Sequence, residues 1–108
     1  MSAHKEMLVY EVAVTLEQGA DADVFVDWMH DYHIPGLLAT RCFNAAEFTR
    51  DDTSHLRFRT RYFAIDREAL DRYLAEHAPR LRAEFDRRFG QGTSVRREIW
   101  EVLEMWER

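Results

Sequence analysis

Two histidines in a repeated tripeptide are the residues of this sequence best placed to do chemistry. His33 begins His-Ile-Pro and His77 begins His-Ala-Pro, each after a segment with helical spacing of apolar residues. An imidazole with an unperturbed pKa of about 6.5 can give or take a proton near neutral pH, so both are candidate catalytic residues. Alternatively, each ring caps a helix that ends before its proline. The matched positions favour capping, because an acid–base pair does not require two equal tripeptides.

Aromatic side chains near His33 could line a ligand pocket. Trp28, Tyr32 and Tyr62 are the candidates. We expect His33 to border a cleft between the first helix and the sheet, where it could act as an acid or base. The same three rings also suit a hydrophobic core, which is their more common role.

A metal site has little support in the sequence. His30 and His33 are neighbours on a helix, but two histidines supply too few ligands, and Asp31 should point elsewhere. Cys42 is the single cysteine, which excludes an internal disulfide and a cysteine-built zinc site, and its place in a predicted strand indicates a buried, inert thiol. We therefore expect neither a metal nor a cofactor.

Three arginines alternate along one predicted strand. Arg57, Arg59 and Arg61 therefore share a face of the sheet, where guanidinium groups could bind an anion such as a carboxylate or phosphate. The alternative is ion pairing with acidic residues of neighbouring strands. The expected partners are Glu11, Glu47 and Glu101. Residues 80–88 mix arginines and acids at helical spacing, which predicts a solvated helix face.

The first half of the chain reads as a strand and a helix. The apolar, β-branched residues 7–16 predict a strand that is packed on both sides. Asp21 should cap a helix over residues 21–34. Pro35 disfavours helical geometry in the residue before it, so this helix should stop near its histidine, with one further turn over residues 36–39.

The second half repeats this organisation. Residues 41–50 and 55–65 predict two strands of a hairpin. Asp66 should cap a second helix over residues 66–89, and residues 93–106 supply a long last strand. The order strand–helix–strand–strand–helix–strand predicts the α+β class and a ferredoxin-like βαββαβ fold, with an antiparallel sheet of order 4-1-3-2 and both helices on one face. We expect a single domain over residues 1–108.

The other face of this sheet would be left uncovered. The first strand carries Val9 and Ala13 on one face and Tyr10, Val12 and Val14 on the other, so either face would expose apolar side chains. We therefore expect a second copy of the chain to pack on the uncovered face as a homodimer. Trp106, at the end of the long last strand, should reach the partner.

Composition restricts the partners and the location. The chain has 15 Lys and Arg against 20 Asp and Glu, a net charge of −5, which argues against binding to nucleic acid. No segment approaches the roughly 20 apolar residues that span a membrane. The N-terminal MSAHKEMLVYE has no signal-peptide core, so the expected location is the cytoplasm.

Two segments resemble a known family. WMHDYHIPGLLATRCF and YLAEHAPRLRAEFDRRFG are similar to a bacterial family known as domain of unknown function 4286, and the resemblance covers nearly the whole chain. It implies a dimeric α/β barrel, a group that includes heme-free monooxygenases, small isomerases and mutarotases, heme-handling proteins and proteins without a known reaction. Family members usually carry glycine where this chain has Arg41. No catalytic residue is established for the family, so the resemblance implies a fold and a dimer rather than a reaction.

Two functions remain open at this point. The first is a homodimeric accessory or small-molecule-binding module without catalysis of its own, and the lack of a clear catalytic cluster favours it. The alternative is a cofactor-independent enzyme of isomerase or monooxygenase type, which acts on a small apolar or aromatic compound with His33 as acid or base. An aromatic content of 13% supports this alternative.

Overall fold

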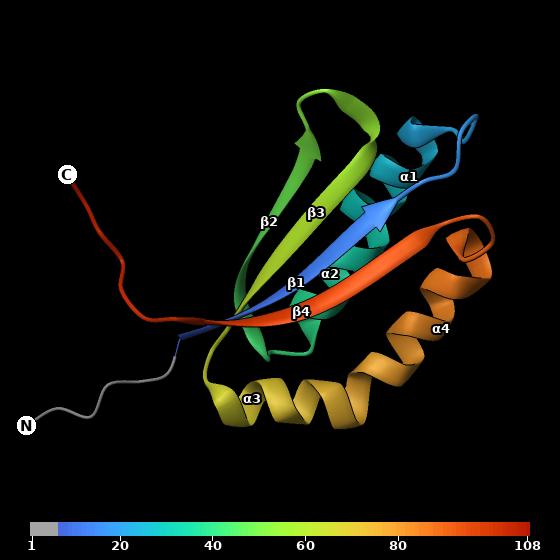
Figure 1. Cartoon of the computed structure of the whole chain (residues 1–108). Coiled ribbons are helices and arrows are strands. Elements are labelled where there is room, and N and C mark those ends of the chain that lie inside the picture. Colours follow the sequence, from blue (N-terminus) through green and yellow to red (C-terminus); the bar gives the residue numbers. More distant parts are fainter. Residues whose placement is uncertain (1–6) are drawn as a thin grey trace, which may run out of the picture.

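The computed structural model describes residues 7–108 and shows one antiparallel sheet with its helices on one face (Figure 1). The strands are β1 (Met7–Thr15), β2 (Phe43–Asp51), β3 (Ser54–Ala64) and β4 (Ser94–Val102). The sheet order is β2-β3-β1-β4, so the predicted ferredoxin-like fold and strand order are confirmed. Residues 1–6, which begin the segment without a predicted signal peptide, lie outside the described residues.

Each covering helix consists of two α-helical segments joined by a π-helical turn. The first helix contains α1 (Ala22–Trp28), the π turn η1 (Met29–His33) and α2 (Ile34–Ala39). The second contains α3 (Arg67–Arg72), the π turn η2 (Tyr73–His77) and α4 (Ala78–Phe89). Both predicted caps are present. The Asp21 carboxylate accepts from the N–H groups of Asp23 and Val24, and the Asp66 carboxylate accepts from the N–H of Ala69 at 2.8 Å.

The two prolines do not end the helices, which corrects the expectation that the first helix stops near its histidine. In each π turn an N–H bonds to the carbonyl five residues back, from Ile34 to Met29 and from Ala78 to Tyr73. A proline inside an α-helix lacks an N–H and clashes with the carbonyl four residues before it. The wider π turn directly before each proline relieves this clash, so the chain continues as a helix.

Side chains alternate between a covered and an open face of the sheet. On β3, Leu56, Phe58 and Tyr62 are buried beneath the helices, and the arginines between them point to the open face. Val9 of β1 also belongs to the open face, but it lies between its cross-strand neighbours Phe63 and Trp100 and is fully buried. The open face therefore exposes less apolar surface on β1 than the sequence suggested.

The last strand is shorter than predicted. It ends at Val102, which pairs with Met7, the first described residue, so the residues beyond it have no described strand beside them. Residues 103–108 extend away from the sheet (Figure 1). Leu103, Met105 and Trp106 in this tail are 82%, 70% and 85% exposed.

The connection from α2 to β2 contains a backbone conformation that L-residues rarely adopt. Arg41 has a φ of 62°, in the left-handed region, directly after the helix end at Thr40. The family resemblance in the sequence leads us to expect glycine at this position, and glycine has no Cβ to strain there. β2 therefore begins at Phe43 rather than at Arg41 as predicted.

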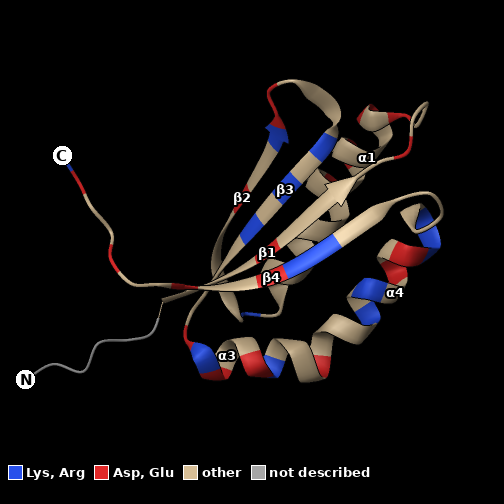
Figure 2. Ribbon diagram, in the orientation of Figure 1, with Lys and Arg blue, Asp and Glu red and all other residues tan. Residues whose placement is uncertain are grey.

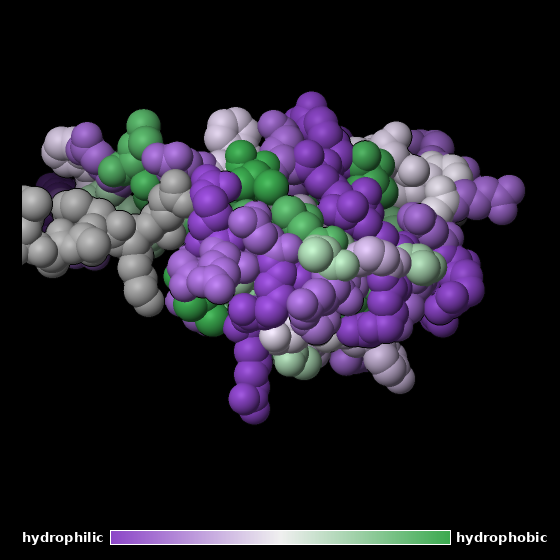
Figure 3. All heavy atoms as spheres, turned by 90° about the horizontal axis from the view of Figure 1, so that it is seen from below, coloured by the Kyte–Doolittle hydropathy of each residue, from purple (hydrophilic) through white to green (hydrophobic). Residues whose placement is uncertain are grey.

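The surface of the molecule on the side of α3 and α4 is mainly polar. Figure 3, which views the molecule from the side on which α3 and α4 lie, shows hydrophilic atoms with small separate hydrophobic areas between them. Within residues 7–108, no helix is long and apolar enough to cross a membrane.

Candidate ligand-binding site at His33

His33 lies between the first helix and α4. Its ring stacks on the indole of Trp28, with the ring centroids 4.8 Å apart and the planes at 20°, and its centroid is 5.8 Å from the Phe85 ring of α4. The Nδ1 atom of His33 is buried and has no hydrogen-bond partner among the described residues. Because buried polar atoms are nearly always hydrogen-bonded, this atom requires an explanation.

An aromatic groove runs along one side of the His33 ring. This outer groove has a volume of about 480 Å³ and is lined by Trp28, Tyr32, His33, Glu84, Arg87 and Arg88. Trp28 is half-buried and Tyr32 is 71% exposed, so the groove combines an aromatic floor with an opening to solvent. A neighbouring hollow of about 450 Å³ shares Trp28, Tyr32 and Arg88 and extends the groove.

A second, much smaller space lies on the inner side of His33. This inner cavity has a volume of about 20 Å³, enough for about one water molecule. Its polar lining comes from His33, Tyr10, Tyr62, Tyr73, Arg82 and Arg97. Arg82 donates from a terminal nitrogen to the Tyr10 hydroxyl at 3.0 Å, whereas its Nε is buried without a partner among the described residues. Two unpartnered buried nitrogens, on His33 and on Arg82, therefore belong to residues that line one cavity.

The surroundings of His33 keep its ring neutral. Burial lowers the pKa of His33 to about 4, the Arg97 charge acts in the same direction, and Glu84 opposes them. Burial also raises the pKa values of Tyr62 and Tyr73, so both phenols stay protonated. At neutral pH His33 is thus an uncharged imidazole that can accept a proton or share a hydrogen bond with a ligand.

The structure brings the predicted pocket residues together on two sides of His33. Trp28 and Tyr32 line the outer groove, while Tyr62 is 1% exposed and lines the inner cavity. His77 occupies the equivalent place in the second half, where its ring stacks on Tyr73 at 6.4 Å, and it lines neither of these two spaces. The helix continues beyond both histidines, so the capping interpretation was wrong.

His30 and Asp31 differ from the sequence-based expectation. His30 is exposed as predicted, but its Nδ1 lies 2.9 Å from the Asp31 carboxylate, which therefore points toward it rather than away. His30 and His33 consequently occupy different environments. Among the described residues, no three His, Cys, Asp or Glu side chains gather as metal ligands would.

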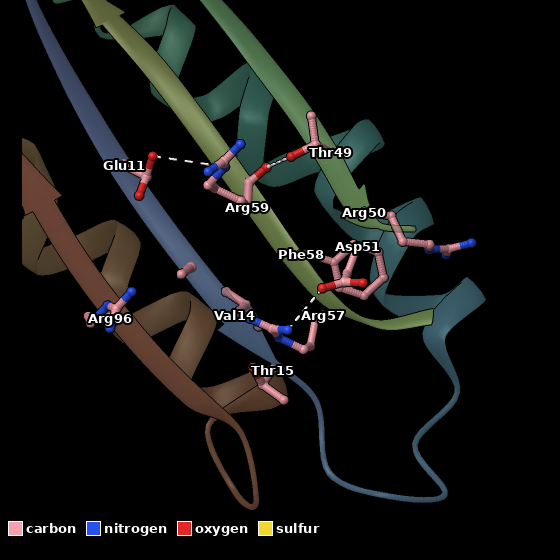
Figure 4. A pocket seen from close by; sticks show the side chains of 11 residues that line it. Glu11, Val14, Thr15, Thr49, Arg50, Asp51, Arg57, Phe58, Arg59 and Arg96 are labelled. Atoms are coloured by element: carbon pink, nitrogen blue, oxygen red, sulfur yellow. Dashed lines mark hydrogen bonds and ion pairs between the residues drawn. The ribbon is translucent and has the colours of Figure 1, made fainter. Parts of the chain in front are cut away.

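The arginine row lies on the open face of the sheet and is paired with acids. Figure 2 marks the basic and acidic positions along the strands. Arg57 contacts Asp51 at 2.9 Å, Arg59 approaches Glu11 at 3.9 Å, and Arg61 lies between Glu11 and Glu47. Figure 4 shows Arg57 directed at Asp51 and Arg59 directed at Glu11, around a shallow hollow of about 350 Å³. Glu101 is not a partner, because its register neighbour Leu8 faces the helices. The structure thus agrees with the pairing interpretation, and anion binding by this row stays a prediction.

Two arginines of the inner cavity were missed by the sequence analysis. Arg82 was assigned to a solvated helix face, but the helix places it beside the buried Ala78 and Phe85, and it points inward to Tyr10. Its spacing of four residues after Ala78 and three before Phe85 was the available signal. Arg97 pairs with Val12 and therefore lies on the covered face. Strand alternation predicts this position only when the register of β4 is known.

Solved structures of other proteins share this fold. The cofactor-independent oxygenase SnoaB from Streptomyces nogalater matches with a TM-score of 0.75 and 11% identity, over 95% of this chain and 99% of that chain. An ethyl tert-butyl ether d (ethd) family protein from Bacillus halodurans gives 0.67 and 17%, over 89% and 99%. A dimeric ferredoxin-like protein from an uncultured marine organism gives 0.66 and 10%, over 94% and 100%. No curated protein resembles the chain in sequence.

The topology and these matches define a ferredoxin-like βαββαβ fold. The family model for a domain of unknown function, DUF4286, matches residues 7–103, and the chain belongs to this family. The resemblance seen in the sequence is therefore confirmed. No catalysis is established for the family.

Proposed function

We propose that this protein is a homodimeric, cytoplasmic small-molecule-binding protein whose ligand is an apolar or aromatic compound in the outer groove. The observation that supports this most directly is the buried Nδ1 of the uncharged His33 ring, which has no hydrogen-bond partner in the described part of the chain and lies next to a groove with an aromatic floor. A ligand with a hydrogen-bonding group beside the ring supplies the partner, and Trp28 and Tyr32 contact its apolar body.

The test is a titration of the full chain with a panel of aromatic fragments, followed by NMR of the imidazole and indole resonances. We expect bound fragments to shift the signals of His33 and Trp28. Trp28→Ala should weaken binding, whereas His77→Gln, which changes the equivalent residue of the other half, should leave it intact. Fragments that shift only signals away from the groove, or equal losses in the two variants, would contradict the proposal.

A cofactor-independent enzyme is the second candidate, and one observation favours it. His33 is uncharged at neutral pH, and its Nδ1 forms no hydrogen bond with any residue of 7–108, as a general base requires. The similarly folded SnoaB is a cofactor-independent oxygenase, which by fold alone is an analogy. Proton exchange of the enolisable aromatic ketone β-tetralone in heavy water, followed by NMR, tests this role. Faster exchange with the wild type than with His33→Gln supports catalysis, and equal rates argue for binding alone.

The homodimer is proposed to form through the open face of the sheet. Both helices lie on the other face, so nothing within residues 7–108 covers this one (Figure 1). The open face carries rows of opposite charge, and Trp100 on it remains 50% exposed. A twofold interface between two such faces can match arginines of one copy with acids of the other. A solved protein of similar fold is itself dimeric, which supports a dimer as the assembly.

A further inference from the structure

The inner cavity beneath His33 contains two cationic side chains and no anionic one. Arg82 from α4 and Arg97 from β4 both line it, and no Asp or Glu of residues 7–108 does. Neither arginine forms an ion pair with any carboxylate in this part of the chain. Arg82 makes one hydrogen bond, to the neutral hydroxyl of Tyr10. This lining stands out in a protein that carries five more acidic than basic charges.

Removing charges from water is costly unless an opposite charge or hydrogen bonds compensate. Arg61, whose side chain is 32% exposed, follows that rule, because it lies between Glu11 and Glu47. Arg82 departs from it, because it is half-buried and its Nε is buried without a partner. No carboxylate of residues 7–108 forms an ion pair with this guanidinium.

The fields of both arginines converge on the cavity. The positive charge of Arg97 lowers the pKa of the His33 ring at one wall. Arg82 and Arg97 both act to lower the pKa of the Tyr73 phenol at another wall, although burial outweighs them. Positive potential at a partly desolvated site attracts an anion and strengthens its hydrogen bonds.

We propose that the ligand of this protein carries an anionic oxygen, as an aromatic carboxylate does, which Arg82 and Arg97 bind in the inner cavity. This inference rests on the proposed function, because the apolar body of the same ligand lies in the outer groove. The cavity of about 20 Å³ accommodates one oxygen atom. The His33 ring is the wall between groove and cavity, so the ring turns away from Trp28 to admit the charged group.

The alternative occupant of the cavity is a single water molecule. Water would satisfy the hydrogen bonds of the Arg82 Nε and the His33 Nδ1, but it would leave the two positive charges without compensation. A neutral and an anionic ligand of equal shape therefore distinguish the two occupants. Naphthoate and naphthamide are such a pair, and both are small enough for the outer groove.

The experiment compares the affinities of the full chain for naphthoate and naphthamide by isothermal calorimetry near neutral pH. We expect naphthoate to bind at least about tenfold more tightly, the size of one charge-assisted contact. Arg82→Gln and Arg97→Gln should each remove most of this preference. Arg80→Gln, two residues away on the exposed side of α4, and Arg96→Gln, on the open face of β4, should keep it.

Two further measurements keep the test independent of folding defects. Circular dichroism identifies a variant that does not fold, and Arg82→Lys keeps the charge, so it should retain part of the preference. In the wild type, bound naphthoate should raise the pKa of His33, as seen in the NMR titration of its ring.

Equal affinity for the two compounds, with both lost in Trp28→Ala, would overturn the anion site and leave the proposed function standing. Equal losses in the Arg80→Gln and Arg82→Gln variants, or no change in the His33 pKa, would also overturn it. If neither compound binds the wild type, the anion site is refuted, whereas the proposed function is judged by its own fragment panel.

Discussion

At the scale of single residues, His33 makes the stability of the protein depend on pH. The folded state holds its pKa at about 4, below the ordinary value of 6.5, so between these values the unfolded chain binds a proton that the folded chain does not. The contribution of the neutral His33 ring to the free energy of unfolding is complete above about pH 6.5 and is lost as the pH falls toward about 4. We expect a loss of roughly 2–3 kcal/mol in the free energy of unfolding across this window.

Urea unfolding of the wild type and His33→Gln at several pH values measures this contribution. The variant cannot take up the proton, so its stability should fall less steeply over the window. Carboxylates titrate in both proteins, which makes the difference between the two curves the informative quantity. Parallel curves would show that His33 is not held neutral by the fold.

Arg41 is strained by its left-handed backbone, with a φ of 62°. This conformation costs an L-residue about 1–2 kcal/mol. Glycine avoids this cost, but its greater freedom in the unfolded chain offsets part of the gain in stability. The Arg41 side chain is exposed, so its removal should cost little. Arg41→Gly should therefore raise the free energy of unfolding by about 0.5–1 kcal/mol.

Chemical denaturation of Arg41→Gly and Arg41→Ala checks this expectation. Alanine keeps the Cβ that clashes in the left-handed region, so this control should show no comparable gain. A destabilised glycine variant would mean that the arginine side chain makes a contribution that outweighs its strain.

Residue chemistry was only partly predictable from the sequence. The candidates His33, Trp28 and Tyr62 do lie around one region, because each belongs to an apolar stripe whose direction the helical or strand period determines. The inward position of Arg82 was hidden, because residues at the border of a stripe can turn either way. The lack of a partner for the His33 Nδ1 depends on packing between elements that are far apart in sequence.

At the scale of elements, the two π turns are the feature that the sequence did not reveal. The two tripeptides occupy equivalent places in the two helices, but Pro35 predicts a helix end, because ending a helix is the more common role of proline. The π turns instead let both helices continue, and the first one carries His33 to the space beside α4. π turns of this kind are frequent at functional sites.

The second helix depends on its N-terminal cap. The Asp66 carboxylate accepts from the Ala69 N–H at 2.8 Å, and this carboxylate is partly buried. Asp66→Ala should lower the free energy of unfolding by about 1 kcal/mol, and Asp66→Asn, which keeps an acceptor oxygen, should lower it by less.

Thermal and urea unfolding measure these changes. Asp71→Ala removes an exposed acid from the interior of the same helix and should change stability by less than about 0.5 kcal/mol. If the Asp66 and Asp71 variants lose the same amount, the cap is not the source of the effect.

The strands were easier to predict than the helix ends. The alternation in β3 and the apolar run in β1 identified both central strands and their covered faces. The end of β4 was overestimated, because Leu103, Met105 and Trp106 look like strand residues although no described strand lies beside them. The length of a strand depends on its register and on the strands that pair with it, and the local sequence does not determine either.

At the scale of the whole molecule, the homodimer predicts a measurable change of mass. The wild type should sediment at twice the chain mass of 12.9 kDa. Trp100→Asp places a charge at the half-exposed centre of the proposed interface, and Trp106→Asp places one in the exposed tail, so both should shift the equilibrium toward the monomer. Sedimentation across a range of concentrations measures this shift.

Ala83→Asp is the matched control, because it adds the same charge on the exposed side of α4. It should leave the dimer unchanged. A wild type that sediments as a monomer, or a loss of the dimer in all three variants, would rule out an interface through the open face.

The strand order makes the two halves of the chain depend on each other for folding. The two halves interleave, since β1 and β2 of the first half are not neighbours, and neither are β3 and β4 of the second. Each strand hydrogen-bonds only to strands of the other half, so neither half can build a sheet alone. A chain of half this length could form this sheet only as a pair of copies. For the same reason, a chain cut between β2 and β3 should regain its fold when the two fragments are mixed.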